Sequence, residues 1–175
     1  MPNTIRSPIC AVMGHVDHGK SSLLDYIRNT SIVSREAGAI TQAIGASFVP
    51  MQTIADLCTR CVKTFDPKQF SLPGLLFIDT PGHAAFTNLR KRGGNLADIA
   101  ILVVNINEGL MPQTIEAIQI LKQYKTPFII AANKADLVQG FRSNPDQSVI
   151  QTILSDKQLS TAIDTKIYEL VGKIY

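Results

Sequence analysis

Residues 14–21 read Gly14-His15-Val16-Asp17-His18-Gly19-Lys20-Ser21. A glycine, four further residues and Gly-Lys-Ser stand here between the apolar run Ile9–Met13 and the amphipathic segment Lys20–Asn29. A strand, a glycine-bounded loop and a helix form the context in which this pattern binds phosphate. Backbone N–H groups of such a loop point at phosphate oxygens, and the helix N-terminus adds a favourable field. The pattern therefore predicts a phosphate-binding loop, the P-loop.

Particular side chains of this loop are expected to carry the chemistry. Lys20 would reach the β- and γ-phosphates of a nucleoside triphosphate, and the Ser21 hydroxyl would complete the shell of a Mg²⁺ ion. A glycine turn without a ligand is the alternative, and three partners further along the chain make this alternative less favoured. The residues of the loop predicted to bind nucleotide are Asp17, His18, Gly19, Lys20, Ser21 and Ser22.

Short apolar runs alternate with amphipathic segments along the whole chain. Nearly continuous apolar runs are typical of parallel strands covered on both faces. Their alternation with helical segments predicts the α/β class, with a three-layer P-loop NTPase fold built on a doubly wound, mostly parallel sheet. Strands are expected at Ile9–Met13, Ala46–Val49, Gly74–Asp79, Ile99–Asn105 and Phe128–Asn133. Helices are expected at Lys20–Asn29, Thr53–Thr64, Ala84–Arg92, Gln113–Gln123 and within Ser148–Ile174, and loops at Thr30–Gly45 and Gln139–Gln147.

Composition limits the class of protein. A chain of 175 residues with 45% hydrophobic and 18% charged residues suits one soluble globular domain. The net charge of +3 neither requires nor excludes a nucleic-acid partner. No apolar run approaches the roughly 20 residues of a membrane span. Three cysteines without a secretory signal indicate a reducing compartment, so we expect a cytoplasmic protein without a membrane partner.

Two of the cysteines, Cys58 and Cys61, form a C-x-x-C pattern. Zinc or redox chemistry is one interpretation of this spacing. A structural zinc site needs four ligands, however, and no second Cys or His pair lies at a suitable spacing. Buried thiols on one face of a helix are therefore the favoured interpretation.

The first partner motif is Asp79-Thr80-Pro81-Gly82-His83, at the end of the expected strand Gly74–Asp79. Asp79 would lie at the carboxyl edge of the sheet and hold Mg²⁺ through a water molecule. The N–H of Gly82 can approach a γ-phosphate because no Cβ blocks it. An aspartate that caps a helix is the alternative.

The second partner motif is Asn133-Lys134-Ala135-Asp136, which follows another apolar run. The carboxylate of Asp136 can accept hydrogen bonds from N1–H and the N2 amino group of guanine, a pair that adenine lacks. Asn133 would brace the neighbouring loops, and Lys134 would lie over the base. Alone the motif is often just a turn. After a P-loop and Asp-x-x-Gly, it predicts GTP and GDP as ligands.

Thr41 lies in the long loop after the first expected helix. A threonine in such a loop can bind Mg²⁺ through its hydroxyl and the γ-phosphate through its N–H, so the loop senses the triphosphate. A solvated loop threonine is the alternative. The predicted metal ligands are then Ser21, Thr41 and Asp79.

These motifs, together with three further stretches, resemble those of the translational GTPases. The further stretches are Glu36-Ala37-Gly38-Ala39-Ile40-Thr41-Gln42, Leu89-Arg90-Lys91-Arg92-Gly93-Gly94 and Asn107-Glu108-Gly109-Leu110-Met111-Pro112-Gln113-Thr114. They are similar to the G domain of translation initiation factor 5B of the archaeal and eukaryotic type, the relative of bacterial initiation factor 2. The similarity extends over essentially the whole chain.

The resemblance implies a ribosome-dependent GTPase that promotes joining of the ribosomal subunits. It implies that His83 is the catalytic residue that positions the attacking water, aided by ribosomal RNA, and that Val16 and Ile40 flank it as an apolar gate. It also implies that Asp17 helps to hold a monovalent cation. The basic run Arg90–Arg92 would contact ribosomal RNA phosphates or be a solvated helix face, and both interpretations remain open.

The chain also departs from the family pattern. Ala39 stands where a second glycine is common, and Ala43 where a histidine is common. We expect residues 1–175 to be a C-terminally incomplete G domain, without the last strand, its Ser-Ala-x loop and the final helix. Phe128–Asn133 would then be a hydrophobic edge of the sheet. Initiator tRNA would be bound only by missing domains. The alternative function is a non-catalytic or weakly binding fragment that needs a complementary chain.

Overall fold

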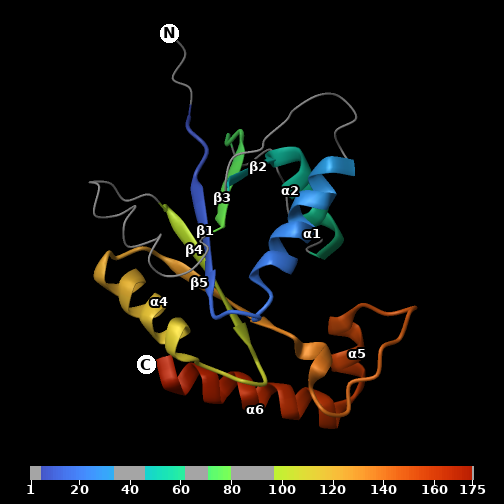
Figure 1. Ribbon diagram of the computed structural model, residues 1–175. Coiled ribbons are helices and arrows are strands. Elements are labelled where there is room, and N and C mark those ends of the chain that lie inside the picture. The colour runs from blue at the N-terminus through green and yellow to red at the C-terminus, as the bar shows by residue number, and fades with distance from the viewer. Residues whose placement is uncertain (1–4, 34–45, 62–70, 80–96, 175) are drawn as a thin grey trace.

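The structure is a computed structural model that describes residues 5–33, 46–61, 71–79 and 97–174. Its elements follow the alternating order expected from the sequence (Figure 1). The strands are β1 (Ile9–Gly14), β2 (Ala46–Pro50), β3 (Gly74–Asp79), β4 (Ile99–Asn105) and β5 (Phe128–Asn133). The helices are α1 (Lys20–Val33), α2 (Met51–Cys61), α4 (Pro112–Gln123), the 3₁₀ helix η2 (Ala135–Leu137), α5 (Val149–Ser155) and α6 (Lys157–Ile174).

Within the described residues the strands form one sheet in the order β2-β3-β1-β4-β5. β1 pairs in parallel with β3 and β4, β4 pairs in parallel with β5, and only β2 runs antiparallel to its neighbour. The register aligns Val12 with Asp79, Gly14 with Val103, and Asn105 with Asn133. The carboxyl ends of β1, β3, β4 and β5 therefore meet at one edge of the sheet, where ligands bind in folds of this type.

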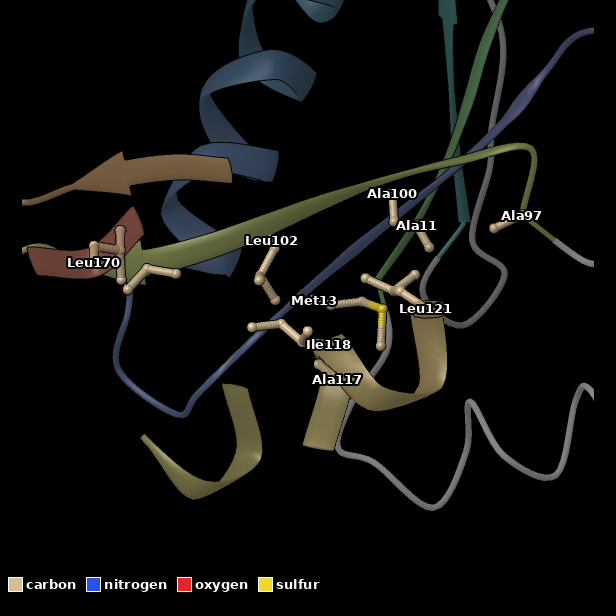
Figure 2. Close-up of a cluster of buried hydrophobic side chains, with 10 residues drawn as sticks. Ala11, Met13, Ala97, Ala100, Leu102, Ala117, Ile118, Leu121 and Leu170 are labelled. Carbon is tan, nitrogen blue, oxygen red and sulfur yellow. The ribbon is translucent and has the colours of Figure 1, made fainter. Parts of the chain in front are cut away.

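Side chains that alternate along the strands fill two cores, one on each face of the sheet. On one face Leu24 of α1 packs against Cys10 and Val12 of β1, and Ile54 of α2 joins the same cluster. On the other face α4 and α6 cover the sheet, and Figure 2 shows Met13 of β1 beside Ile118 and Leu121 of α4. Because helices cover both faces, the predicted three-layer, doubly wound, mostly parallel α/β fold is confirmed.

Several predicted helix bounds need correction. α1 continues to Val33, so residues 30–33 do not belong to the predicted loop Thr30–Gly45. Thr30 and Ser31 are poor helix formers, but extending an existing helix costs far less than nucleating one. α2 begins at Met51, directly after β2, rather than at Thr53. The predicted helix Ala84–Arg92 lies outside the described residues.

The predicted helical region Ser148–Ile174 is divided at Asp156. Asp156 has extended backbone angles, and its carboxylate accepts the N–H groups of Gln158 (2.9 Å) and Leu159 (3.1 Å). The same residue thus ends α5 and caps α6, which explains why one periodic pattern became two helices. Ser148 starts α5 with a capping box, in which it exchanges hydrogen bonds with Gln151.

β5 lies at the edge of the sheet among the described strands, as expected. Ile129 is 55% exposed and Ile130 36% exposed, so this edge is hydrophobic. In the part of the chain that the structure describes, no helix has the length and apolar character needed to cross a membrane.

The cysteines divide between a strand and a helix. Cys10 is buried in β1, and its burial raises the pKa of the thiol to about 11. Cys58 is a half-buried free thiol of α2. Cys61 ends that helix and its side chain lies outside the description, so the structure does not test the interpretation of the C-x-x-C pattern.

Candidate nucleotide-binding site

The P-loop connects β1 to α1 and has two glycines at positions where a side chain would not fit. Gly14 has φ 144°, and a Cβ there would collide with the backbone carbonyl of Val103 in β4. Gly19 has φ 94°, and a Cβ there would collide with the side-chain amide of Asn133. Both glycines are therefore needed for the loop to pass close to its neighbours.

The P-loop makes a tight turn before α1 begins. Asp17 has φ 60°, the left-handed conformation, and the N–H of His18 approaches the carbonyl of His15 at 3.4 Å. The Lys20 ammonium donates a hydrogen bond to that same carbonyl over 2.6 Å. Lys20 therefore lies over the loop, where its charge and the α1 N-terminus both favour an anion.

An open pocket of about 340 Å³ lies beside the loop. Its lining residues come from the P-loop, the first turn of α1 and the segment after β5. They are Asp17, Gly19, Lys20, Ser21, Ser22 and Lys134. The tertiary structure thus brings together five of the six P-loop residues expected to bind nucleotide with one from the second partner motif. Their role in binding stays a prediction.

The base loop, which we define as residues Asn133–Asp136, begins where β5 ends. The Asn133 amide donates to the carbonyl of His18 over 2.8 Å, the bracing contact expected from the sequence. Lys134 has φ 60° and lines the pocket. Asp136 lies in η2, is exposed, and is not among the residues that line the pocket.

His18 is the sixth of the P-loop residues and is fully buried instead of lining the pocket. Its Nδ1 accepts the backbone N–H of Asn105 over 3.2 Å, so its Nε2 carries the hydrogen and donates to Glu108 Oε2 over 3.3 Å. Burial lowers the pKa of His18 despite the nearby Glu108 carboxylate, which favours this neutral form. The ring therefore links the P-loop to the end of β4, and the predicted part of His18 in binding nucleotide stays a prediction.

The sequence interpretation missed Asn105 and Glu108 as members of this site. Both lie in the β4 turn, which we define as residues Asn105–Glu108 and which begins at the last residue of β4, at the carboxyl edge of the sheet. Three polar residues at the end of an apolar strand, Asn105, Asn107 and Glu108, were a usable signal.

Other predicted site residues are described in part or not at all. Asp79 ends β3 and pairs in register with Val12 of β1, which puts its backbone beside the start of the P-loop. The side chain of Asp79 is not described. Thr41, Gly82 and the predicted catalytic residue His83 lie outside the described residues, as does Ile40 of the predicted apolar gate. Val16, the other gate residue, is 57% exposed.

Comparison with known proteins bears directly on this geometry. The family model described as the elongation factor Tu GTP binding domain matches residues 5–171. The chain belongs to this family. Its description, the GTP-binding domain of a translation factor, agrees with the resemblance drawn from the motifs.

Relatives narrow the similarity to initiation factors. A probable translation initiation factor IF-2 of Methanocella arvoryzae is 59% identical over 171 residues, which cover 97% of this chain and 28% of that protein. The corresponding protein of Methanoculleus marisnigri is 57% identical over 98% of this chain and 28% of its own length. The crystal structure of GDP-bound aIF5B from Aeropyrum pernix matches with a TM-score of 0.82 and 52% identity, over 97% of this chain and 28% of that one. The chain thus spans less than a third of these relatives.

Proposed function

We propose that residues 1–175 form a G domain that binds GTP and GDP with Mg²⁺ and hydrolyses GTP to GDP and phosphate. The proposal rests on the arrangement of the P-loop and the base loop around one pocket. Residues of the P-loop and Lys134 of the base loop line this pocket, and the Asn133 side chain joins the two loops by a hydrogen bond. A phosphate loop beside a base loop suits a guanine nucleotide. The similarity to GDP-bound aIF5B supports the same ligand.

The residues at the pocket fit a hard cation held between protein oxygens and phosphates. Ser21 lies in the first turn of α1 and lines the pocket, and Asp79 ends β3, the strand that pairs with β1. Mg²⁺ in such sites takes one or two protein oxygens and fills its shell with phosphates and water, where it neutralises phosphate charge. We assign Ser21, Thr41 and Asp79 to this role, and Asp17 to a monovalent cation beside the phosphates.

Catalysis in this scheme depends on positioning and charge rather than on covalent chemistry. His83 orients a water molecule that attacks the γ-phosphorus, and the bond to the β–γ bridging oxygen breaks. Lys20 and the N–H groups of the P-loop and Gly82 stabilise the charge that develops on the phosphate oxygens. Asp136 selects guanine, and Ser22, His18 and Gly19 shape the phosphate cradle.

We further propose that this domain serves a cytoplasmic translation initiation factor whose hydrolysis is stimulated by the ribosome during subunit joining. Ribosomal RNA would be the stimulating partner. Initiator tRNA would be bound by parts of the factor that this chain does not include. The support is the 51–59% identity to archaeal proteins named probable initiation factor IF-2.

A weakly binding domain that needs a complementary chain is the second candidate. The observation that favours it is the exposure of Ile129 and Ile130 on the edge strand β5. An exposed hydrophobic edge is a surface that another strand can pair with.

Calorimetric titration with GDP, a non-hydrolysable GTP analogue and ATP, each with Mg²⁺, tests the first proposal. Micromolar binding of the guanine nucleotides without ATP binding is expected. Lys20→Ala should weaken binding by about 2–3 kcal/mol, the scale of a charge-assisted hydrogen bond. Absence of binding by a folded chain would favour the second candidate.

A further inference from the structure

A run of hydrogen bonds connects the P-loop to the base loop through the β4 turn. Glu108 stands at its centre: one carboxylate oxygen accepts from His18 Nε2 over 3.3 Å, and the other accepts from the side-chain amide of Asn105. His18 belongs to the P-loop, so Glu108 contacts that loop from a position 90 residues further along the chain.

The run continues from Asn105 to the base loop. The side-chain oxygen of Asn105 accepts the backbone N–H of Asn107 over 3.0 Å. The side-chain amide of Asn107 then donates to the carbonyl of Lys134 over 3.1 Å. Both Asn107 and Glu108 are exposed, and neither is among the residues that line the pocket.

We propose that Glu108 is a positioning residue that orients the P-loop through His18 and the base loop through Asn105 and Asn107. This inference rests on the proposed nucleotide site. Without the carboxylate, the His18 Nε2–H would be buried with no partner in this run, and the Asn105 amide would lose its acceptor. A buried donor without a partner is costly, so both side chains would shift and carry the two loops with them.

The distinguishing property of a positioning role is its effect on base selectivity. A change that only lowers the folded fraction reduces the apparent affinity for every nucleotide by the same factor. A loosened base loop, in contrast, discriminates less between GDP and IDP, which lacks the 2-amino group that Asp136 is proposed to bind.

The experiment titrates the chain with GDP and with IDP and compares Glu108→Ala with the control Glu169→Ala. Glu169 is an exposed carboxylate of α6. Glu108→Ala should weaken GDP binding about tenfold and reduce the preference for GDP over IDP several-fold, as expected when the hydrogen bonds that position the two loops are lost. Glu169→Ala should stay within about twofold of the wild type, as most surface substitutions do.

Glu108→Gln provides a milder variant should the alanine variant fail to fold. The glutamine amide keeps one oxygen acceptor, whereas the Glu108 carboxylate uses both of its oxygens. The affinity and selectivity of Glu108→Gln should therefore lie between those of the wild type and Glu108→Ala. Unchanged GDP binding in the Glu108 variants, or equal losses for GDP and IDP, would overturn the positioning role. Absence of GDP binding in the wild-type chain would instead overturn the proposed function, and the positioning role with it.

Discussion

The side-chain amide of Asn133 donates a hydrogen bond to the carbonyl of His18 across 2.8 Å, although 115 residues separate the two in the chain. The same amide lies where a Cβ on Gly19 would have to be. The P-loop and the base loop are therefore in direct contact at a point where only glycine fits. This contact makes the geometry of one loop depend on the other.

Gly19→Ala should damage the nucleotide site through this contact. Its φ of 94° strains any L residue by about 1–2 kcal/mol, and the added methyl group also displaces Asn133. Gly140→Ala is a matched control, because Gly140 has φ 97° with open space around its Cβ position. We expect both substitutions to lower the free energy of unfolding measured in urea, but only Gly19→Ala to lower the affinity for GDP. Equal GDP affinity in the two variants would show that the Asn133 contact does not matter for binding.

Asp136→Asn should shift the preference of the domain from guanine to xanthine nucleotides. An amide presents a donor to the base edge in place of one carboxylate acceptor, which suits the extra oxygen of xanthine. Competition between GDP and XDP, measured by calorimetry, checks the change. Unaltered guanine selectivity would remove Asp136 from the base site, a result compatible with its absence from the pocket lining.

His83→Ala should leave GTP affinity within a few-fold and abolish ribosome-stimulated hydrolysis, because we assign His83 to the attacking water and not to ground-state binding. The measurement is phosphate release on ribosomes, with the substitution made in a full-length factor. Turnover at the wild-type rate would refute the catalytic assignment.

Asp98 should contribute a pH-dependent part of the stability. Its carboxylate accepts two hydrogen bonds from Arg6, one of them at 2.8 Å, and one from the N–H of Ile9 at 2.8 Å, and these contacts lower its pKa. A lowered folded-state pKa stabilises the protein above the unfolded value of about 3.9, and this stabilisation is lost as the pH falls through the folded value.

The stability advantage of the wild type over Asp98→Asn should therefore shrink as urea unfolding is repeated from neutral to acidic pH. The advantage should be modest, since Arg6 is exposed and water screens the pair. Asp164→Asn, at an exposed position of α6, is the control. A wild-type advantage that grows on acidification would contradict the assigned direction.

The sequence alone predicted β3, β4 and β5 at the bounds the structure has, because each is an apolar run that ends at its first polar residue, Asp79, Asn105 or Asn133. It also located the P-loop and base loop, since Gly14 and Gly19 meet backbone requirements that few other residues satisfy. Family membership followed from the same motifs.

Only the tertiary structure decided where the His18 ring lies. The ring is buried against Asn105 and Glu108, and the predicted part of His18 in nucleotide binding stays a prediction. That contact exists because β1 and β4 pair side by side in a parallel register, and no local pattern near His18 specifies the neighbour of its strand. The division between α5 and α6 was also decided by the tertiary structure. The Asp156 side chain caps α6, whereas the periodic pattern of apolar residues in the sequence continues through this position without a break.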